Sequence, residues 1–521
     1  MRFIEKALKI KAAADKTAAF FERNSHFKNV LLLTAGYLLA RLSALRVVEK
    51  SGDAVFKWRI LRLWCETGNY PATIPEHHQG RWMLNLPVRA LMEVFGTDPW
   101  VYYIYPLLMG LVCVLSIYFI ASRLSGKFHG VLAFLLFAFL PVAADESMQF
   151  LPLVPATGYT MLAVLAMLRY FDTRREMWTL AAGLLLGLGY GCKVTMAYWY
   201  VPFALGLIWF APAAADGHCR FPFAALLMLL TGGALVLVWE FFMLNAFFGV
   251  KWGRLSMLLS GHIGHRIEPQ YLTWYEYLLS ALRPLRTSGK TVYVVPRIML
   301  VIWSSISAVL VMRNRSADRV KRFAALCYIC VYLLHCYVVY KFFPFLHPER
   351  PHARYLLAMF AMGTALSTAS GEEWRMLLRR WGAAPWVGVV SFILFWGTMT
   401  GFLVSSFLNP ILNGDHPGAI LARRRLLVRD GTPAVLRFEP KKRSSTTKEE
   451  KYARMYIVMF APLDELRRVN AEPRALYHDA DGRSYLRLWG EIPEGAPCRV
   501  RVCEEQFCDQ EQLVLKREKK R

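Results

Sequence analysis

An acid, Asp53, follows the first long apolar run of the chain and begins the basic, tryptophan-containing stretch "DAVFKWRILRLW". A single charge at the end of an apolar segment is often no more than an interface residue. Here acidic, aromatic and basic residues alternate with helical spacing, and this pattern predicts amphipathic helices that lie in a membrane interface. A carboxylate above such a surface can accept a proton from a hydroxyl group that approaches from water. Asp53 is therefore our candidate general base.

A second acidic pair, Asp145 and Glu146, lies in "PVAADESMQFLP", between two apolar runs. Two interpretations stay open at this point. The carboxylates can orient an acceptor or hold a metal ion, or they can cap the end of a helix. A further cluster, Glu76, His77 and His78, lacks the helical ligand spacing of a zinc site. We claim no metal site and leave a divalent cation open as a cofactor.

Basic side chains near apolar runs supply the opposite charge. Lys193 interrupts an apolar stretch, where an unpaired ammonium group is costly, and the segment "HPERPHAR" adds a second group of cations. The members of that group are His347, Arg350, His352 and Arg354. Planar guanidinium groups fit phosphate oxygens well. The sequence thus predicts an anion site, while headgroup anchoring of the arginines and a water-facing helix end for Lys193 remain the alternatives.

The rest of the chain must position these groups, and its composition is that of a membrane protein. Of 521 residues, 55% are hydrophobic and only 19% are charged, below the roughly 25% of soluble domains. The apolar residues form runs long enough to cross a bilayer, where backbone groups must be satisfied within helices. The predicted fold class is an all-α polytopic membrane protein with about eleven transmembrane helices. Their expected cores are 29–48, 101–122, 129–148, 153–169, 178–192, 195–213, 222–247, 294–312, 322–343, 354–370 and 384–408.

The loops between these runs alternate in character. Residues 1–28 are rich in Lys and Arg, and so are four short loops: "SRLSGK", "RYFDTRREM", "RNRSADRVKR" and "SGEEWRMLLRR". Placing these five segments in the cytoplasm satisfies the positive-inside rule. The longer loops of the core, 29–408, then lie on the extracytoplasmic side. They include 49–100, with its interfacial helices, and the loop 248–293. The net charge of +25 follows this pattern, so it indicates membrane insertion and anionic lipids rather than nucleic acid.

The C-terminal segment 409–521 differs in composition, and we predict that it forms a small extracytoplasmic α+β domain. After the polar linker "KKRSSTTKEEK", four segments have the pattern of strands: "RMYIVMFAP", "SYLRLWGEI", "CRVRVCEEQF" and "QLVLKRE". Between them, "PLDELRRVNA" is typical of a short helix. Cys498, Cys503 and Cys508 lie close together, and one pair of them can oxidise if the domain is outside the cytoplasm.

Several motifs occur in an order that resembles a known enzyme family. "GRWMLNLPVRALMEVFGTDPW" leads into the second apolar run, which "RLSG" closes, and "LAAGLLLGLGYGCKVTMAYWYVPFAL" and "RPHARYLLAMFAM" follow. The set covers about residues 29–370 and resembles the GT-C fold glycosyltransferases that use sugars on polyprenyl phosphate. It is most similar to the bacterial branch of the dolichyl-phosphate-mannose protein mannosyltransferase family, which includes the aminoarabinose transferase of lipid A.

This resemblance implies a helical membrane core and an inverting glycosyltransferase with its site on the extracytoplasmic face. Asp53 matches the family's acid in the first external loop, and it would deprotonate or orient the acceptor hydroxyl for attack on the anomeric carbon. The residues implied in binding the donor phosphate are Lys193, His347, Arg350 and Arg354. The implied partners are a polyprenyl-phosphate-linked sugar, membrane lipids, and a glycan, lipid or protein acceptor. A bacterial inner membrane is the expected location, and an endoplasmic reticulum enzyme would have the same layout facing the lumen.

The second acid departs from the family pattern. The family's usual aspartate falls nearer "LVPATGYTML", where this chain has Pro155 and Thr157, and Asp145 and Glu146 come several residues earlier. We keep these two acids as candidates for the same role and carry over no metal from the family.

Three other functions stay open. A ligase or polymerase of lipid-linked glycans would share the fold and the cationic cluster. A non-catalytic membrane scaffold would follow if the missing second acid means lost activity. A transporter or lipid flippase is disfavoured, because the sequence shows neither clear internal repeats nor symmetric broken helices.

Overall fold

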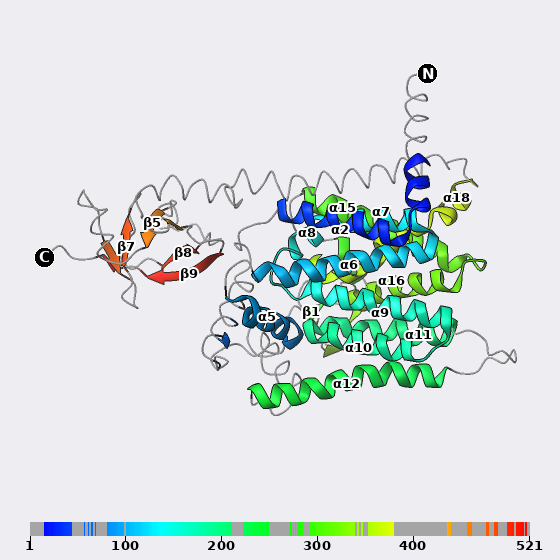
Figure 1. Ribbon diagram of the computed structural model, residues 1–521, viewed down its shortest axis with the longest axis horizontal. Helices are drawn as coiled ribbons and strands as arrows, with labels where there is room; N and C mark the ends of the chain where they lie inside the picture. Colours follow the sequence, from blue (N-terminus) through cyan, green and yellow to red (C-terminus); the bar gives the residue numbers. More distant parts are fainter. Residues whose placement is uncertain are drawn as a thin grey trace, which may run out of the picture. The chain divides into compact units, whose positions relative to one another are not determined.

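The computed structural model describes a region of helices and the strands of a C-terminal sheet (Figure 1). The described residues are 15–43, 81–97, 101–210, 222–248, 279–285, 291–338 and 353–379, short pieces at 57, 61, 64–65, 68, 271–272, 275, 277, 341–342 and 345–346, and the strands between 435 and 517. The chain forms two compact units, Met1–Ser43 with Ile60–Ser406, and Ala44–Arg59 with Phe407–Arg521.

The first unit contains the helices. The α-helices are α2 (His26–Ser43), α5 (Trp82–Phe95), α6 (Val101–Ser125), α7 (Lys127–Ala138), α8 (Pro141–Glu146), α9 (Leu153–Thr173), α10 (Met177–Cys192), α11 (Tyr200–Phe210), α12 (Phe223–Phe248), α15 (Thr291–Arg313), α16 (Arg319–Tyr337), α17 (Leu357–Ala369) and α18 (Gly371–Arg379). The 3-10 helices are η1 (Val194–Trp199), η2 (Leu279–Leu285) and η3 (Ala353–Leu356).

Among the residues that the structure describes, four helices are long and apolar enough to cross a membrane. They are Tyr103–Ser125, Leu153–Thr173, Phe223–Ala246 and Arg319–Tyr337. The predicted class, a helical multi-pass membrane protein, is confirmed. The number of eleven spans stays a prediction, and the predicted span 384–408 lies outside the described residues.

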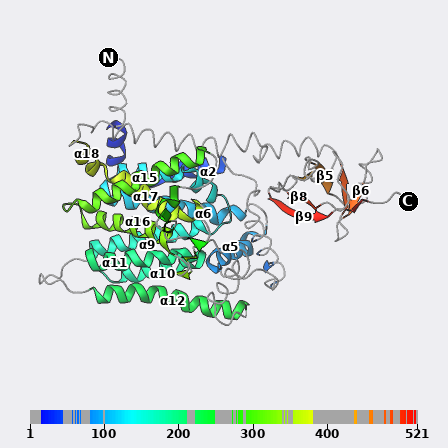
Figure 2. The same cartoon turned by 180° about the vertical axis from the view of Figure 1, so that it is seen from behind.

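The helices pack in layers. α6, α9, α10 and α12 follow one another, each in contact with the next (Figure 1). α17 packs against both α15 and α16 (Figure 2), and all of its residues except Thr368 are buried. α12 instead exposes a broad apolar surface that suits contact with lipid, formed by Phe223, Leu227, Leu230, Leu237, Trp239 and Phe242.

Glycines allow α10 and α12 to approach closely. A Cβ atom added to Gly183 would collide with the carbonyl oxygen of Leu229, and one added to Gly187 would lie 2.7 Å from the Cβ of Val236. Small residues at helix contacts let membrane helices approach through their backbones. The glycine-rich sequence of α10 therefore specifies its packing against α12.

The variant Gly183→Ala is expected to destabilise the protein by about 1–3 kcal/mol, because the added methyl group must displace the backbone of α12. Unfolding in detergent, followed by the loss of helical circular dichroism, measures this change. Gly36→Ala in α2 is the matched control, since a Cβ atom there meets no atom within 4 Å. Equal stabilities of the two variants would contradict this account of the contact.

The single span predicted over 129–148 is wrong in its extent. The structure divides it into α7, which ends at Ala138, and the short α8, which begins at Pro141. Leu140 is extended, with φ −63° and ψ 121°, because a residue that precedes proline disfavours the helical conformation. The acids Asp145 and Glu146 consequently lie in a separate short helix.

The chain reverses direction at Lys193. α10 ends at Cys192, and Lys193 is extended, with φ −149° and ψ 123°. The hydroxyl group of Tyr200 then donates a hydrogen bond to the carbonyl oxygen of Gly183, at 2.9 Å, so the following residues run back along α10. The structure thus has a tight hairpin at this point, with 3-10 helix in its returning arm.

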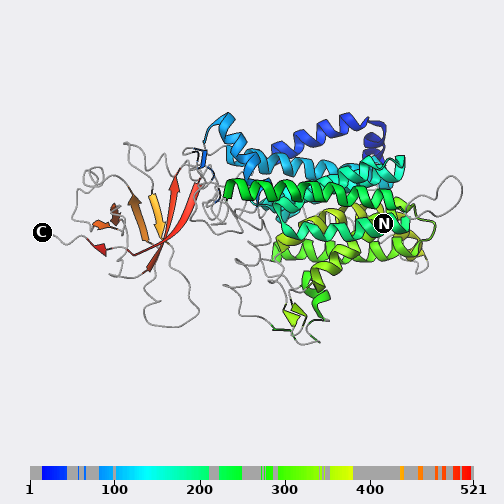
Figure 3. The same ribbon diagram turned by 90° about the horizontal axis from the view of Figure 1, so that it is seen from below.

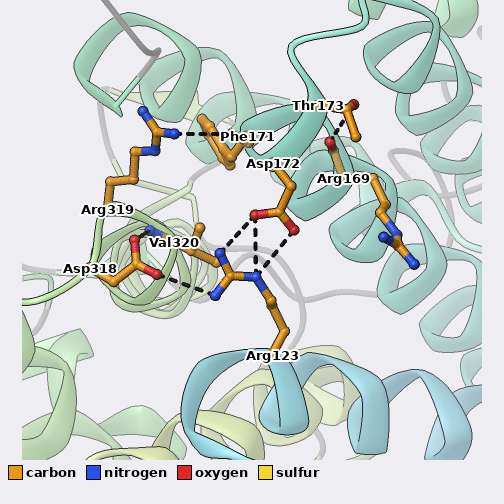
Figure 4. A network of polar contacts seen from close by, with 8 residues as sticks. All are labelled: Arg123, Arg169, Phe171, Asp172, Thr173, Asp318, Arg319 and Val320. Atoms are coloured by element: carbon orange, nitrogen blue, oxygen red, sulfur yellow. Dashed lines mark hydrogen bonds and ion pairs between the residues drawn. The ribbon is translucent and has the colours of Figure 1, made fainter. Parts of the chain in front are cut away.

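Charged residues link the helix ends at one end of the bundle (Figure 4). Arg123 of α6 forms an ion pair with Asp172 of α9 at 2.7 Å and another with Asp318 at 3.3 Å. Asp318 also caps α16 by accepting a hydrogen bond from the backbone N–H of Val320. These contacts join three of the basic loops that the sequence predicts on a common side.

The fourth basic loop and the N-terminal segment reach the same end. Lys321 of α16 pairs with Glu373 of α18 at 2.8 Å, with both side chains buried. Glu22 accepts a hydrogen bond from the backbone N–H of Phe128, at the start of α7. All five segments predicted on the cytoplasmic side thus contribute residues to one end of the bundle.

A small antiparallel sheet joins two of the loops that are predicted to be external. Its strands are β1 (Tyr271–Leu272), β2 (Lys341–Phe342) and β3 (Phe345–Leu346), in the order β1-β3-β2. Residue Tyr271 lies opposite Leu346. Nearby, the hydroxyl group of Tyr277 donates to the carbonyl oxygen of Tyr337, at 2.9 Å, so the loop 248–293 also contacts the end of α16.

Among the described residues, the second unit contains a seven-stranded antiparallel sheet in the order β10-β6-β7-β5-β4-β8-β9. Strands of this sheet can be seen in Figure 3. Its strands are β4 (Val435–Phe438), β5 (Tyr456–Phe460), β6 (Leu476–His478), β7 (Ser484–Arg487), β8 (Pro497–Glu504), β9 (Phe507–Val514) and β10 (Lys516–Arg517). Each of the four predicted segments contains a strand, and β4 and β6 are additional. The predicted helix 462–471 lies outside the described residues.

Candidate functional site

The structure describes some of the candidate site residues and leaves others out. Those outside the described residues are Asp53, Glu76, His77, His78, His347, Arg350 and His352. Arg354 is described through its backbone, as the second residue of η3. The side chains of Asp145, Glu146 and Lys193 are described, and the site is built from these three and their surroundings.

Asp145 and Glu146 occupy the last turn of α8. Glu146 is only 7% exposed. Neither acid caps a helix start, because the N-cap residues of α8 and α9 are Leu140 and Pro152. Negative charge at a helix C-terminus is unfavourable, and so is a buried carboxylate in a membrane protein. The role of these two acids in orienting an acceptor stays a prediction.

Lys193 is held at the break between α10 and η1, and its ammonium group points onto an aromatic ring. The Nζ atom lies 4.3 Å from the centroid of the Tyr355 ring, a cation–π contact. Tyr355 belongs to η3 and directly follows Arg354. The structure therefore brings Lys193 together with the end of the "HPERPHAR" segment, which sequence alone could not establish.

η3 also contacts α8. The acidic turn, the lysine and the residues 353–356 thus converge on the end of the bundle opposite the Arg123 network. An arrangement with carboxylates on one element and an ammonium group on another can hold an anionic ligand and position a hydroxyl group beside it.

Helix α5 closes around this end from the predicted first external loop. One face of α5 is buried, including Trp82 and Val88, as expected for an interfacial helix. A Cβ atom added to Gly191 would lie 2.9 Å from the Cβ of Met83, so glycine at this position lets α5 reach the end of α10. The α10 terminus that carries Lys193 is therefore held by α5.

Glu240 is an acidic residue within the apolar helix α12. The carboxylate is buried, 3% exposed, and accepts a hydrogen bond from the indole N–H of Trp82. Trp82 also packs edge to face against Trp239, with ring centroids 4.4 Å apart. The hydrogen bond between Trp82 and Glu240 therefore helps to anchor α5 on α12.

Two aromatic residues and one histidine near Lys193 were not predicted from the sequence. Besides Tyr355, these are Tyr198 of η1 and His335 of α16, whose rings lie edge to face with centroids 5.2 Å apart. His335 sits in the last turn of an apolar helix, and this position was the only sequence signal that could have identified it.

Among the described residues, no group of three or more His, Cys, Asp or Glu side chains is arranged to hold a metal ion. Thr157, near the position of the family's second acid, is fully buried in the first turns of α9. Among the described residues, the acidic candidates on this side are the two residues of α8.

Comparisons with known proteins agree with the resemblance in the sequence. Residues 81–239 match the model of the family described as dolichyl-phosphate-mannose-protein mannosyltransferase. A search of curated proteins finds no match.

Several solved structures are similar to the chain. A structure of ArnT from Cupriavidus metallidurans bound to undecaprenyl phosphate is 13% identical, with a TM-score of 0.44 and coverage of 80% of this chain and 82% of that one. The apo structure of oligosaccharyltransferase from Archaeoglobus fulgidus is 13% identical, with a TM-score of 0.44 and coverage of 83% and 60%. The region matched by the family model includes Asp145, Glu146 and Lys193. From α5 to α12, this chain therefore resembles the dolichyl-phosphate-mannose-protein mannosyltransferases.

Proposed function

We propose that the chain is an inverting glycosyltransferase that moves a sugar from polyprenyl phosphate to an acceptor at the extracytoplasmic membrane face. The family match over residues 81–239 supports this class of reaction and donor. The structural observation that carries the proposal is the placement of the Lys193 ammonium 4.3 Å from the ring of Tyr355, at the element η3 that α8 also contacts.

In the proposed reaction, Asp53 takes the proton of the acceptor hydroxyl group. The acceptor oxygen attacks the anomeric carbon, and the bond from that carbon to the phosphate oxygen breaks on the opposite side. The anomeric configuration is therefore inverted. The products are the glycosylated acceptor and polyprenyl phosphate, which leaves with one more negative charge than the phosphate group carried in the donor.

The additional charge explains the need for cations. Fixed positive groups in a poorly hydrated site stabilise charge that develops in the transition state, because they need no reorganisation as the reaction proceeds. We assign this role to Lys193 and to the arginines of the 347–354 segment, Arg350 and Arg354, with His347 beside them. Asp145 and Glu146 are assigned to orienting the acceptor.

The membrane location follows the distribution of charge. Basic loops gather at the Arg123 end of the bundle, so we place that end in the cytoplasm and the α8–η3 end in the periplasm of a bacterial inner membrane. A polyprenyl-linked donor would then reach the site from within the lipid.

The proposal is tested with purified protein in nanodiscs. A panel of undecaprenyl-phosphate-linked sugars, among them mannose, glucose and aminoarabinose, is mixed with envelope lipids, glycans and peptides as acceptors. Mass spectrometry should find a glycosylated product together with an equal amount of undecaprenyl phosphate. Movement of sugar or lipid across sealed vesicles, without a covalent product from any donor, would instead show a transporter.

A further inference from the structure

A histidine next to the Lys193 hairpin has a ring nitrogen that the fold buries without using it. His335 lies in the last turn of α16, and its ring packs at 74° against the ring of Tyr198. Its Nε2 atom is buried and has no hydrogen-bond partner among the described residues. Leaving a buried polar atom unpaired costs about 1–3 kcal/mol, so such an atom calls for an explanation.

The position of His335 connects it to the candidate site. Tyr198 belongs to η1, which begins directly after Lys193, and α16 packs against η1. An imidazole from α16 and an ammonium group from the α10–η1 break thus lie at the same end of the bundle.

Together these two groups suit an anion that carries several oxygen atoms. An ammonium group offers three N–H donors, and an imidazole offers one more from a second direction. A phosphate on a lipid could accept from both, and such hydrogen bonds to a charged group are stronger than those between neutral groups. α16 is itself apolar enough to cross a membrane, which suits a ligand that arrives with a prenyl chain.

We propose that His335 is a donor-binding residue, whose Nε2–H donates a hydrogen bond to the phosphate group of polyprenyl phosphate beside Lys193. The identity of this ligand rests on the proposed function. The bond made by His335 holds the phosphate in both the donor and the released carrier, so it acts on binding and not on proton transfer.

Binding of undecaprenyl phosphate to the full-length protein, measured by tryptophan fluorescence or native mass spectrometry, tests the inference. His335→Phe keeps a ring beside Tyr198 but removes the donor, and it should weaken binding about tenfold. His335→Gln places an amide N–H at a position similar to that of Nε2, and it should recover most of the affinity. The matched control is His129→Gln in α7, at the opposite end, where Nδ1 is likewise buried and unpaired among the described residues; it should bind as the wild type does.

Three results would overturn the inference: wild-type affinity in His335→Phe, equal losses in His335→Phe and His129→Gln, or competition by phosphatidic acid as strong as that by undecaprenyl phosphate. A lower melting temperature of His335→Phe with unchanged affinity would mean a purely structural role. A failure of the proposed function can be distinguished from a failure of this inference. If the wild type binds undecaprenyl phosphate and His335→Phe does not, but no donor yields product, the binding site stands and the transferase assignment falls.

Discussion

Replacing Asp53 by Asn is expected to lower the rate constant of sugar transfer by about 10²–10⁴-fold, the usual contribution of a general base. Asparagine has nearly the size of aspartate and can still hydrogen-bond the acceptor, but it cannot take its proton. The Michaelis constant for the lipid-linked donor should change little, because Asp53 is assigned to the acceptor side of the reaction. Steady-state kinetics with the donor that gives product measure both constants.

The control for this variant is Glu93→Gln in α5, an exposed acid that forms an ion pair with Arg89 within the same helix. It removes one negative charge from the same predicted loop without touching the proposed chemistry. Wild-type turnover in Asp53→Asn, or an equal loss in Glu93→Gln, would remove Asp53 from the mechanism.

Replacing Lys193 by Met should weaken binding of the donor by about 100-fold. The ammonium group both attracts the phosphate and donates hydrogen bonds to it, and a hydrogen bond to a charged group contributes about 1.5–3 kcal/mol. Methionine keeps a long apolar side chain that can lie against the ring of Tyr355, so packing is largely preserved. Measurements of the donor Michaelis constant and of undecaprenyl phosphate affinity should show parallel losses.

Lys127→Met provides the comparison at the other end of the bundle. Its Nζ atom donates to the carbonyl oxygens of Glu22 and Asn24, both at 2.9 Å, and it carries the same charge. Donor affinity in this variant should be unchanged. If Lys193→Met bound the donor normally, or if both variants lost affinity to the same degree, the phosphate-binding role of Lys193 would be wrong.

Much of the helical core could be predicted because lipid imposes a simple rule on sequence. A segment that crosses a bilayer needs about 20 apolar residues and must be helical, so long apolar runs identify α6, α9 and α12 closely. The positive-inside rule likewise grouped the loops that the structure joins through Arg123, Asp172 and Asp318.

The break between α7 and α8 shows a feature that hydropathy alone does not predict. The run of apolar residues continues through Pro141, so the segment 129–148 has the pattern of one helix. The proline nevertheless ends α7, because it lacks a backbone N–H and restricts Leu140. Local backbone chemistry thus placed Asp145 and Glu146 in a helix that hydropathy could not detect.

The surroundings of Lys193 depend on contacts between distant parts of the chain. An unpaired ammonium group is costly in an apolar run, and this marked Lys193 as a candidate. Its neighbours Tyr355 and His335 are ordinary residues of a loop end and a helix end in the sequence. Only the packing of α16 against η1 and the contact of Lys193 with Tyr355 in η3 bring these two residues to the same end of the bundle as Lys193.

Following both parts of the donor through one turnover tests the central claim most directly. The lipid-linked sugar is labelled separately in its sugar and in its phosphate, and the products of the wild-type protein are separated. The account predicts that all transferred sugar label enters the acceptor with inverted configuration, while all phosphate label stays on the polyprenyl chain. Phosphate label in the glycosylated product, or recovery of intact donor on the other side of a sealed membrane without any product, would contradict it.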